Sequence, residues 1–258
     1  MGSGMTFSLS SLLGRVGTFA RGVHPDARKL TAATPIRRLP FAPRLTLPLL
    51  QHIGKPARPI VRVGEEVVRG QPIAEADGFM SAALHAPADG VIEAIDLRPT
   101  ALGAWQPSIV MHVYEASTQT VRWGDPRDME ALSAQDIVAA VRASGMVGLG
   151  GAAFPSHVKL SGTAETPIHT LVVNGCECEP YLTCDHRMML ELGDELMRGI
   201  GYVLRALGAT RAIVGVEDNK MDAVQALRAR IPAGSPITVE PVRTKYPQGA
   251  EKMLVHAL

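Results

Sequence analysis

Three short apolar runs, each followed by polar residues, constrain the fold of this chain more than any other feature. They lie at residues 170–174, 212–216 and 237–242 and have the length and composition of buried strands. A stretch with helical periodicity, from about residue 185 to residue 207, separates the first two, and an amphipathic helix at 221–230 separates the last two. Strand, helix, strand, helix, strand predicts a parallel, Rossmann-like sheet by the right-handed crossover rule.

The polar residues that follow these strands are expected to come together, because the carboxyl ends of parallel strands share one edge of a sheet. Asn174, Glu177 and Glu179 follow the first strand, Asn219 follows the second and Tyr246 follows the third. Glu177 and Glu179 are two apart on an extended segment, so both side chains are expected to point the same way. Ligand binding is predicted at this edge.

A glycine cluster precedes the sheet. Gly148, Gly150 and Gly151 follow a helix-like stretch that begins with a capping box at Ser133 and ends at Gly145. Glycines let backbone N–H groups approach an anion closely, which favours a phosphate-bearing ligand; a plain tight turn is the alternative for such a cluster taken alone. Residues 155–159 are expected to form a helical turn, on which Lys159 offers a positive charge or is a solvated surface lysine.

The first half of the chain changes character. Between residues 22 and 124, short strands separated by glycine and proline turns predict a small all-β module similar to the biotinyl/lipoyl barrel-sandwich fold. Carriers of that fold acylate a lysine at a hairpin tip, and the tip here, Asp77 to Ser81, contains none. A structural or docking role is therefore expected. The predicted division is an expression scar and arm at 1–21, the β module at 22–124 and the α/β domain at 125–258.

Composition excludes several classes of protein. The chain has 26 basic and 25 acidic residues in 258, so its formal charge of +1 gives no pull toward nucleic acid. No apolar run approaches the roughly 20 residues that span a bilayer. Three cysteines, at 176, 178 and 184, lack cluster spacing and indicate a reducing, cytoplasmic compartment, and no metal is predicted.

Four motifs, at 148–159, 174–180, 217–220 and 245–252, resemble in order and spacing those of the RnfC (RsxC) family. These proteins are the NADH-side subunits of Rnf electron-transport complexes, and their middle domain is similar to the flavin subunit of complex I. The resemblance runs from about Gly22 onward.

The resemblance implies that electrons pass from NADH through FMN to iron–sulfur centres of a membrane-bound, ion-translocating complex. Other Rnf subunits would be the partners and would hold the chain at the cytoplasmic face of the inner membrane. Hydride transfer belongs to the cofactor, so no catalytic residue is assigned. The residues that match FMN-binding positions are Gly148, Gly150, Gly151, Lys159, Asn174, Glu177, Asn219, Tyr246, Gly249 and Glu251. Those that match NADH-binding positions are Phe154, Glu177, Glu179 and Glu251.

The chain departs from the family pattern in three places. Ala153 stands where the loop has a third glycine, and Cys176 stands where the complex I protein has an aspartate. The family's two four-iron clusters belong to a region beyond the last motif, so this chain alone is expected to turn over poorly. The alternatives are a cobalamin-reductase-like flavoprotein and a non-catalytic assembly module whose flavin pocket is empty.

Overall fold

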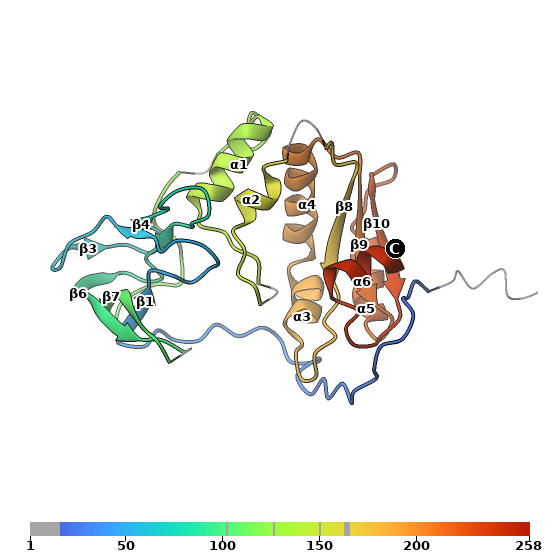
Figure 1. Ribbon diagram of the computed structural model, residues 1–258, viewed down its shortest axis with the longest axis horizontal. Coiled ribbons are helices and arrows are strands. Elements are labelled where there is room, and N and C mark those ends of the chain that lie inside the picture. The colour runs from blue at the N-terminus through green and yellow to red at the C-terminus, as the bar shows by residue number, and fades with distance from the viewer. Residues whose placement is uncertain (1–15, 102, 126, 150, 163–165) are drawn as a thin grey trace, which may run out of the picture. The chain divides into compact units, whose positions relative to one another are not determined.

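The computed structural model describes residues 16–101, 103–125, 127–149, 151–162 and 166–258, so part of the predicted arm and Gly150 lie outside the described residues. The chain forms two compact units, and each is described by itself (Figure 1). The α/β unit comprises Met1–Arg37, His169–Leu204 and Ala209–Leu258, and the β unit comprises Arg38–Ile168 with Arg205–Gly208. The predicted division at residue 124 remains a prediction from sequence.

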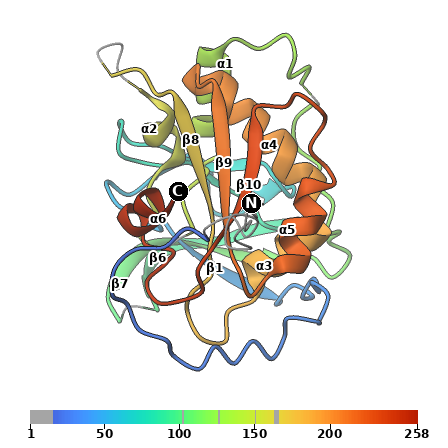
Figure 2. The ribbon, with the colours of Figure 1, turned by 90° about the vertical axis from the view of Figure 1, so that its right-hand side faces the viewer.

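The α/β unit contains the predicted parallel sheet. Its strands β8 (Thr170–Gly175), β9 (Arg211–Glu217) and β10 (Ile237–Val242) lie in the order β10-β9-β8, side by side in Figure 2. Both pairs are parallel, with Val214 of β9 opposite Val173 on one side and Val239 on the other. The periodicity of the sequence therefore identified both the strands and their direction.

Helices cover both faces of this sheet. Ala212, Val214 and Val216 of β9 pack into one core with side chains of α3 (Cys184–Glu191), α4 (Gly193–Leu207) and α5 (Met221–Arg228). On the other face, α6 (Glu251–Ala257) packs Leu254 against Cys176 and Val242. The alternation of side chains along each strand thus buries apolar groups on both faces.

The single helix predicted from about residue 185 to residue 207 is wrong, because the chain breaks it between α3 and α4. Leu192 leaves the helical region, with φ −121° and ψ 29°. Gly193 begins α4 beside the side chain of Arg230, whose Nε would lie 2.8 Å from a Cβ at that position. Arg230 in turn donates to Asp194. The periodicity of the apolar positions continues across the break, which is why the sequence reads as one helix.

The β unit confirms the predicted all-β module. One antiparallel sheet has the order β1-β7-β6-β3 and another has the order β2-β4-β5. Ile73, Ile92, Ile109 and Met111 lie in its core, each at most 1% exposed. The strands are β1 (Arg44–Pro48), β2 (Arg58–Pro59), β3 (Glu66–Val67), β4 (Pro72–Glu75), β5 (Leu84–His85), β6 (Gly90–Pro99) and β7 (Trp105–Val113).

Two helices of the β unit flank the glycine cluster. At the start of α1 (Ala134–Ala143), Ser133 and Asp136 form the predicted capping box. Gly145 follows the helix with φ +67°, in the left-handed region that favours glycine. The predicted turn after the cluster is α2 (Ser156–Leu160), which carries Lys159. In the described part of the chain, none of the helices has the length and apolar character that crossing a membrane requires.

Candidate functional site

The carboxyl edge of the parallel sheet brings several predicted residues together. Asn174, near the end of β8, donates from Nδ2 to the carbonyl of Gly249 over 2.8 Å. Its Oδ1 accepts from the backbone N–H of Cys176 over 3.1 Å. Asn174 therefore fixes the segment after β8 against the turn before α6.

Glu177 is buried at this edge, with its side chain 1% exposed. Its Oε1 accepts from the N–H of Asp185 over 2.8 Å and from the Cys184 thiol over 3.4 Å. Its Oε2 has no hydrogen-bond partner among the described residues, and the Nζ of Lys29 lies 3.8 Å away. A buried carboxylate oxygen without a donor is costly, so this atom is available to a ligand N–H or O–H.

A second buried carboxylate lies beside the first. Glu217, at the end of β9, accepts from the N–H of Glu177 over 2.9 Å and from Nζ of Lys220 over 2.6 Å, both at Oε2. Lys220 also donates to Oδ1 of Asn219 over 3.0 Å. The Oε1 of Glu217 has no hydrogen-bond partner in the described chain. The edge thus holds two acidic side chains that each keep one acceptor open.

Lys29 reaches the same edge from the N-terminal segment (residues 16–37). Its Nζ donates to the carbonyls of Glu177, Glu179 and Leu182, at 2.7, 2.9 and 2.6 Å. Burial lowers the pKa of Lys29, and the charge of Lys220 lowers it further, while Glu177 opposes both effects. The positive charges of Lys29 and Lys220 therefore offset the negative charges of the two buried glutamates.

Cys184 and Asp185 complete the surroundings of Glu177. Burial raises the pKa of the Asp185 carboxyl, and the neighbouring charge of Glu177 raises it further. Burial, followed by the charge of Asp185, raises the pKa of the Cys184 thiol. Ligand atoms of these three residues lie within 4.8 Å of one another, but a thiol whose pKa is raised is a poor metal ligand because metals bind the thiolate.

A small cavity of about 50 Å³ opens between these groups. Side chains of Lys29, Glu177, Glu217, Asn219 and Tyr246 contribute to its walls. Its volume admits one or two water-sized polar groups and no aromatic ring. It therefore suits a single hydroxyl or N–H group donated to the open carboxylate oxygens.

The remaining predicted residues of the α/β unit are exposed. Glu179 lies on the surface while Glu177 is buried, so the two carboxylates occupy different environments and do not share one. Tyr246 is 43% exposed, and Asn219 is exposed with its N–H bonded to Oγ1 of Thr244. Glu251 is the first residue of α6.

The glycine cluster belongs to the β unit, where the loop closes on itself. The N–H of Gly148 donates to the carbonyl of Phe154 over 2.8 Å. Gly151 has φ +93°, and a Cβ there would meet nothing within 4 Å, so the space beside it is open. Ala153 has φ +46°, which explains why glycine suits this position better. The Nζ of Lys159 lies 5.9 Å from the centre of the Phe154 ring.

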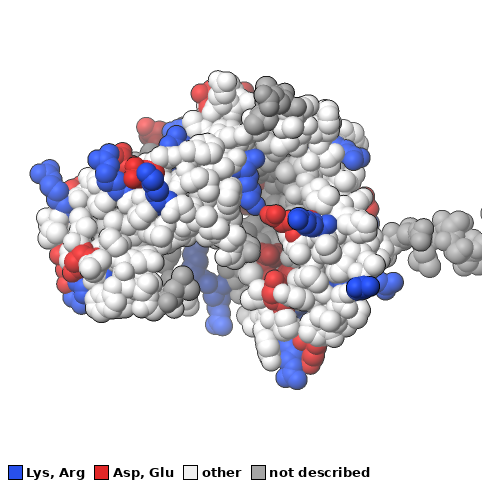
Figure 3. All heavy atoms as spheres, viewed as in Figure 1, with Lys and Arg blue, Asp and Glu red and all other residues white. Residues whose placement is uncertain are grey.

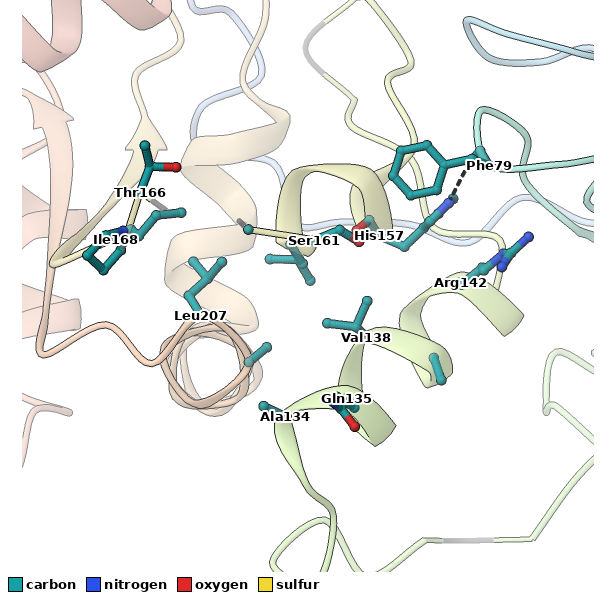
Figure 4. Close-up of a pocket in the computed structure, with 15 residues that line it drawn as sticks. Phe79, Ala134, Gln135, Val138, Arg142, His157, Ser161, Thr166, Ile168 and Leu207 are labelled. Atoms are coloured by element: carbon teal, nitrogen blue, oxygen red, sulfur yellow. Dashed lines mark hydrogen bonds between the residues drawn. The ribbon is translucent and has the colours of Figure 1, made fainter. Parts of the chain in front are cut away.

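A larger cavity of about 610 Å³ lies elsewhere in the β unit and contains none of the predicted site residues. Figure 4 shows it lined by Val138, Ile168, Leu207 and other mainly apolar side chains. His157 and the carbonyl of Phe79, joined by a 2.8 Å hydrogen bond, lie at its margin. Its chemistry does not match that of a phosphate or a nucleotide.

Surface charge gives no further indication of a site. Basic and acidic groups are interspersed over the face shown in Figure 3, in keeping with a formal net charge of +1. The informative charges are buried ones.

Sequence reasoning missed Lys29, Glu217 and Lys220 as members of the site. Glu217 ends an apolar run, which is a local signal of a buried carboxylate. Lys29 offers no such signal, since it meets its partners across about 150 positions of sequence.

Comparison with known protein families matches the two halves of the chain separately. Residues 17–115 match the RnfC barrel sandwich hybrid domain, and residues 141–258 match the Nuo51 FMN-binding domain. Both matches agree with the sheets described above. The chain belongs to the RnfC family.

Three curated relatives, each one subunit of a larger complex, place this RnfC chain further. It is 39% identical to its counterpart in a proton-translocating ferredoxin:NAD(+) oxidoreductase complex from Clostridium ljungdahlii, over 93% of this chain and 53% of the relative. It is 39% identical to the counterpart in the Na(+)-translocating complex from Acetobacterium woodii, over 94% and 55%. With the counterpart in an ion-translocating oxidoreductase complex from Rhodobacter capsulatus it shares 42%, over 91% and 46%. The chain spans about half the length of these relatives.

Among solved structures, the chain is similar to an NAD+-reducing [NiFe]-hydrogenase in the air-oxidized state. The identity is 28%, the TM-score is 0.42, and the match covers 48% of this chain and 23% of the other. A TM-score this low supports no statement about shared function.

Proposed function

We propose that this RnfC chain is the flavin module through which NAD(H) exchanges electrons with an Rnf-type, ion-translocating membrane complex. The observation that carries the proposal is the buried Glu177 carboxylate at the carboxyl edge of the parallel sheet, with one oxygen lacking a donor among the described residues. This is the edge at which open α/β sheets bind ligands. The match of residues 141–258 to an FMN-binding domain supports flavin as the ligand.

The residues fit the donors and charges that FMN presents. Glu177 and Glu217 offer acceptors for ring N–H or ribityl hydroxyl groups, and Asn219 and Tyr246 offer exposed polar groups beside them. Gly148, Gly150, Gly151 and Lys159 are proposed to bind the phosphate, the glycines through backbone N–H groups and the lysine through its charge. Asn174, Gly249 and Glu251 are proposed to complete the FMN-binding set.

Phe154, Glu177, Glu179 and Glu251 are proposed to bind NADH. Carboxylates accept hydrogen bonds from ribose hydroxyls, and an aromatic ring offers a face on which a nucleotide stacks. Bound FMN would accept a hydride and release electrons singly, which is chemistry that no side chain supplies. The protein's part is to orient the two ring systems and to exclude water from the buried carboxylates.

The partners are proposed to be the other subunits of the complex, through which the chain would be peripheral at the cytoplasmic face of the inner membrane. The names of the relatives, which belong to complexes acting between ferredoxin and NAD(+), support this proposal. Iron–sulfur centres that receive or supply single electrons are assigned to a longer form of the chain or to a partner.

The test is an absorption titration of the purified chain, first with FMN and then with NADH in the absence of oxygen. Bound oxidised flavin that bleaches on addition of NADH is the expected result. Glu177→Gln should weaken the NADH-dependent bleaching about tenfold or more, because it replaces a charged acceptor of ribose hydroxyls with a neutral one. Glu240→Gln, an exposed substitution on β10, is the control. Absence of FMN binding at saturating concentration would overturn the proposal and favour the assembly-module alternative.

A further inference from the structure

The N-terminal segment (residues 16–37) is matched by sequence to the barrel-sandwich family domain but belongs structurally to the α/β unit. It follows the loop between β8 and α3, residues 176–183, which we name the β8–α3 loop. The N–H of Tyr181 in this loop donates to the carbonyl of Ala27 over 2.9 Å. Oγ1 of Thr31 and Oγ1 of Thr183 are 2.6 Å apart and share a hydrogen bond.

Lys29 lies between these two contacts and makes the largest set of them. A lysine ammonium has three N–H donors, and three loop carbonyls lie within 2.9 Å of its Nζ. The carbonyls belong to Glu177, Glu179 and Leu182, so all donors are used on one short stretch of backbone. The carboxylate of Glu177, at 3.8 Å, contributes charge without a hydrogen bond.

We propose that Lys29 is a positioning residue that fixes the β8–α3 loop, and with it the carboxylates of Glu177 and Glu179, through these three carbonyl hydrogen bonds. What the carboxylates bind rests on the proposed function; the positioning itself does not. Backbone of an irregular loop has no sheet or helix partners, so without the ammonium its carbonyls must find water or move. The segment thus supplies an element of the α/β unit's own binding edge.

The convergence of three carbonyls distinguishes donor geometry from charge. An arginine at position 29 keeps the positive charge, but its planar guanidinium cannot direct three N–H groups at three carbonyls around one point. If attraction to Glu177 were the important term, Lys29→Arg would preserve the loop. Under the proposal, Lys29→Arg loosens the loop nearly as much as Lys29→Met does.

The test is amide hydrogen exchange of the full chain without nucleotide, followed by mass spectrometry of peptides from residues 176–187. Lys29→Met should raise the exchange rate of the Tyr181 and Asp185 amides about tenfold, because three bonds that close the loop are lost. Arg28→Met is the matched control, since Arg28 is exposed and pairs with Asp26 of its own segment. Unchanged exchange in Lys29→Met would overturn the proposal.

A milder variant keeps the test decisive if Lys29→Met does not fold. Thr31→Val removes one hydroxyl bond between the segment and the loop, and a two- to threefold rise in exchange of the same peptides is expected, in proportion to one lost bond. Exchange at the wild-type rate in a folded Thr31→Val chain would then be the contrary result.

A nucleotide titration separates this proposal from the proposed function. Lys29→Met should raise the NADH concentration for half-maximal flavin reduction about tenfold while Arg28→Met leaves it unchanged, because displaced carboxylates no longer orient the nucleotide. If the wild-type chain binds no flavin, the proposed function fails and the exchange rates still decide whether Lys29 holds the loop. If flavin binds and exchange is unaffected, only the positioning proposal fails.

Discussion

The backbone N–H of Glu177 donates to the carboxylate of Glu217 over 2.9 Å, joining the ends of two neighbouring parallel strands. The same carboxylate oxygen accepts from Lys220. Glu217 therefore fixes the backbone of the residue whose own carboxylate is the best candidate for binding a ligand. Since the side chains of Glu217 and Lys220 are 0% and 3% exposed, their interaction is little screened by water.

Glu217→Gln is expected to lower the free energy of unfolding by about 3–5 kcal/mol, because it leaves the Lys220 ammonium buried without its charged partner. Urea unfolding followed by circular dichroism measures the change. Glu240→Gln, on the exposed side of β10, should change stability by no more than about 0.5 kcal/mol. Adding Lys220→Met to Glu217→Gln should recover part of the loss, since the unpaired charge is then gone. Equal losses in Glu217→Gln and Glu240→Gln would contradict this account.

Much of the fold could be predicted because its signals are local. The apolar runs of β8, β9 and β10 and the capping box at Ser133 each depend on residues a few positions apart, and all are present. The break between α3 and α4 could not be predicted, because the apolar stripe continues across it and its cause, the packing of Arg230 beside Gly193, is tertiary.

The candidate site shows the same limit. Asn174 and Glu177 were identifiable because they follow a predicted strand, and the parallel sheet brings such residues to one edge. Their partners were not, because Lys29 reaches Glu177 from a segment that is distant in sequence. The difference in burial between Glu177 and Glu179 also depends on tertiary packing, which the alternation of side chains on an extended segment does not reveal.

Gly145 and Gly64 offer a matched pair of glycine substitutions. Both have positive φ, +67° and +85°, so an alanine at either position is strained by about 1–2 kcal/mol. At Gly145 a Cβ would also overlap the carbonyl of Ala83, whereas at Gly64 it would meet nothing within 4 Å. Gly145→Ala should therefore cost about 1–3 kcal/mol more than Gly64→Ala in urea unfolding. Similar costs would show that the backbone around Ala83 moves freely.

His52 predicts a dependence of stability on pH. It is buried, and its Nε2 accepts from the N–H of Ala82 over 3.1 Å. Burial lowers the pKa of His52 below its ordinary value of 6.5, and nearby His157 lowers it further, while the Lys55 carbonyl opposes this. Above pH 6.5 the ring is neutral in both states and contributes nothing. As the pH falls below 6.5, the unfolded chain binds a proton that the folded chain resists, so stability falls.

Urea unfolding between pH 7.5 and 5 measures this effect at about five pH values. His52→Gln, which keeps an acceptor near the Ala82 N–H but does not titrate, should flatten part of the decline. His85, whose pKa is also lowered by burial, should account for some of what remains. His256→Gln, an exposed substitution on α6, is the control and should leave the slope unchanged. The same slope in wild type and His52→Gln would rule out His52 as the source.

Lys245 holds the other end of the N-terminal segment. Its ammonium donates to the carbonyls of Phe19 and Arg21 and lies 3.8 Å from the centre of the Phe19 ring. Lys245→Met keeps the apolar stem but removes both hydrogen bonds, so the segment should separate from the sheet more often. Trypsin cleavage after Arg21, followed by mass spectrometry, is expected to quicken about tenfold. Arg243→Met removes an exposed neighbouring cation and should cleave at the wild-type rate. Because Val23 and Tyr246 still exchange two backbone hydrogen bonds, the separation should remain local, and Lys245→Met should leave exchange in the distant β unit unchanged.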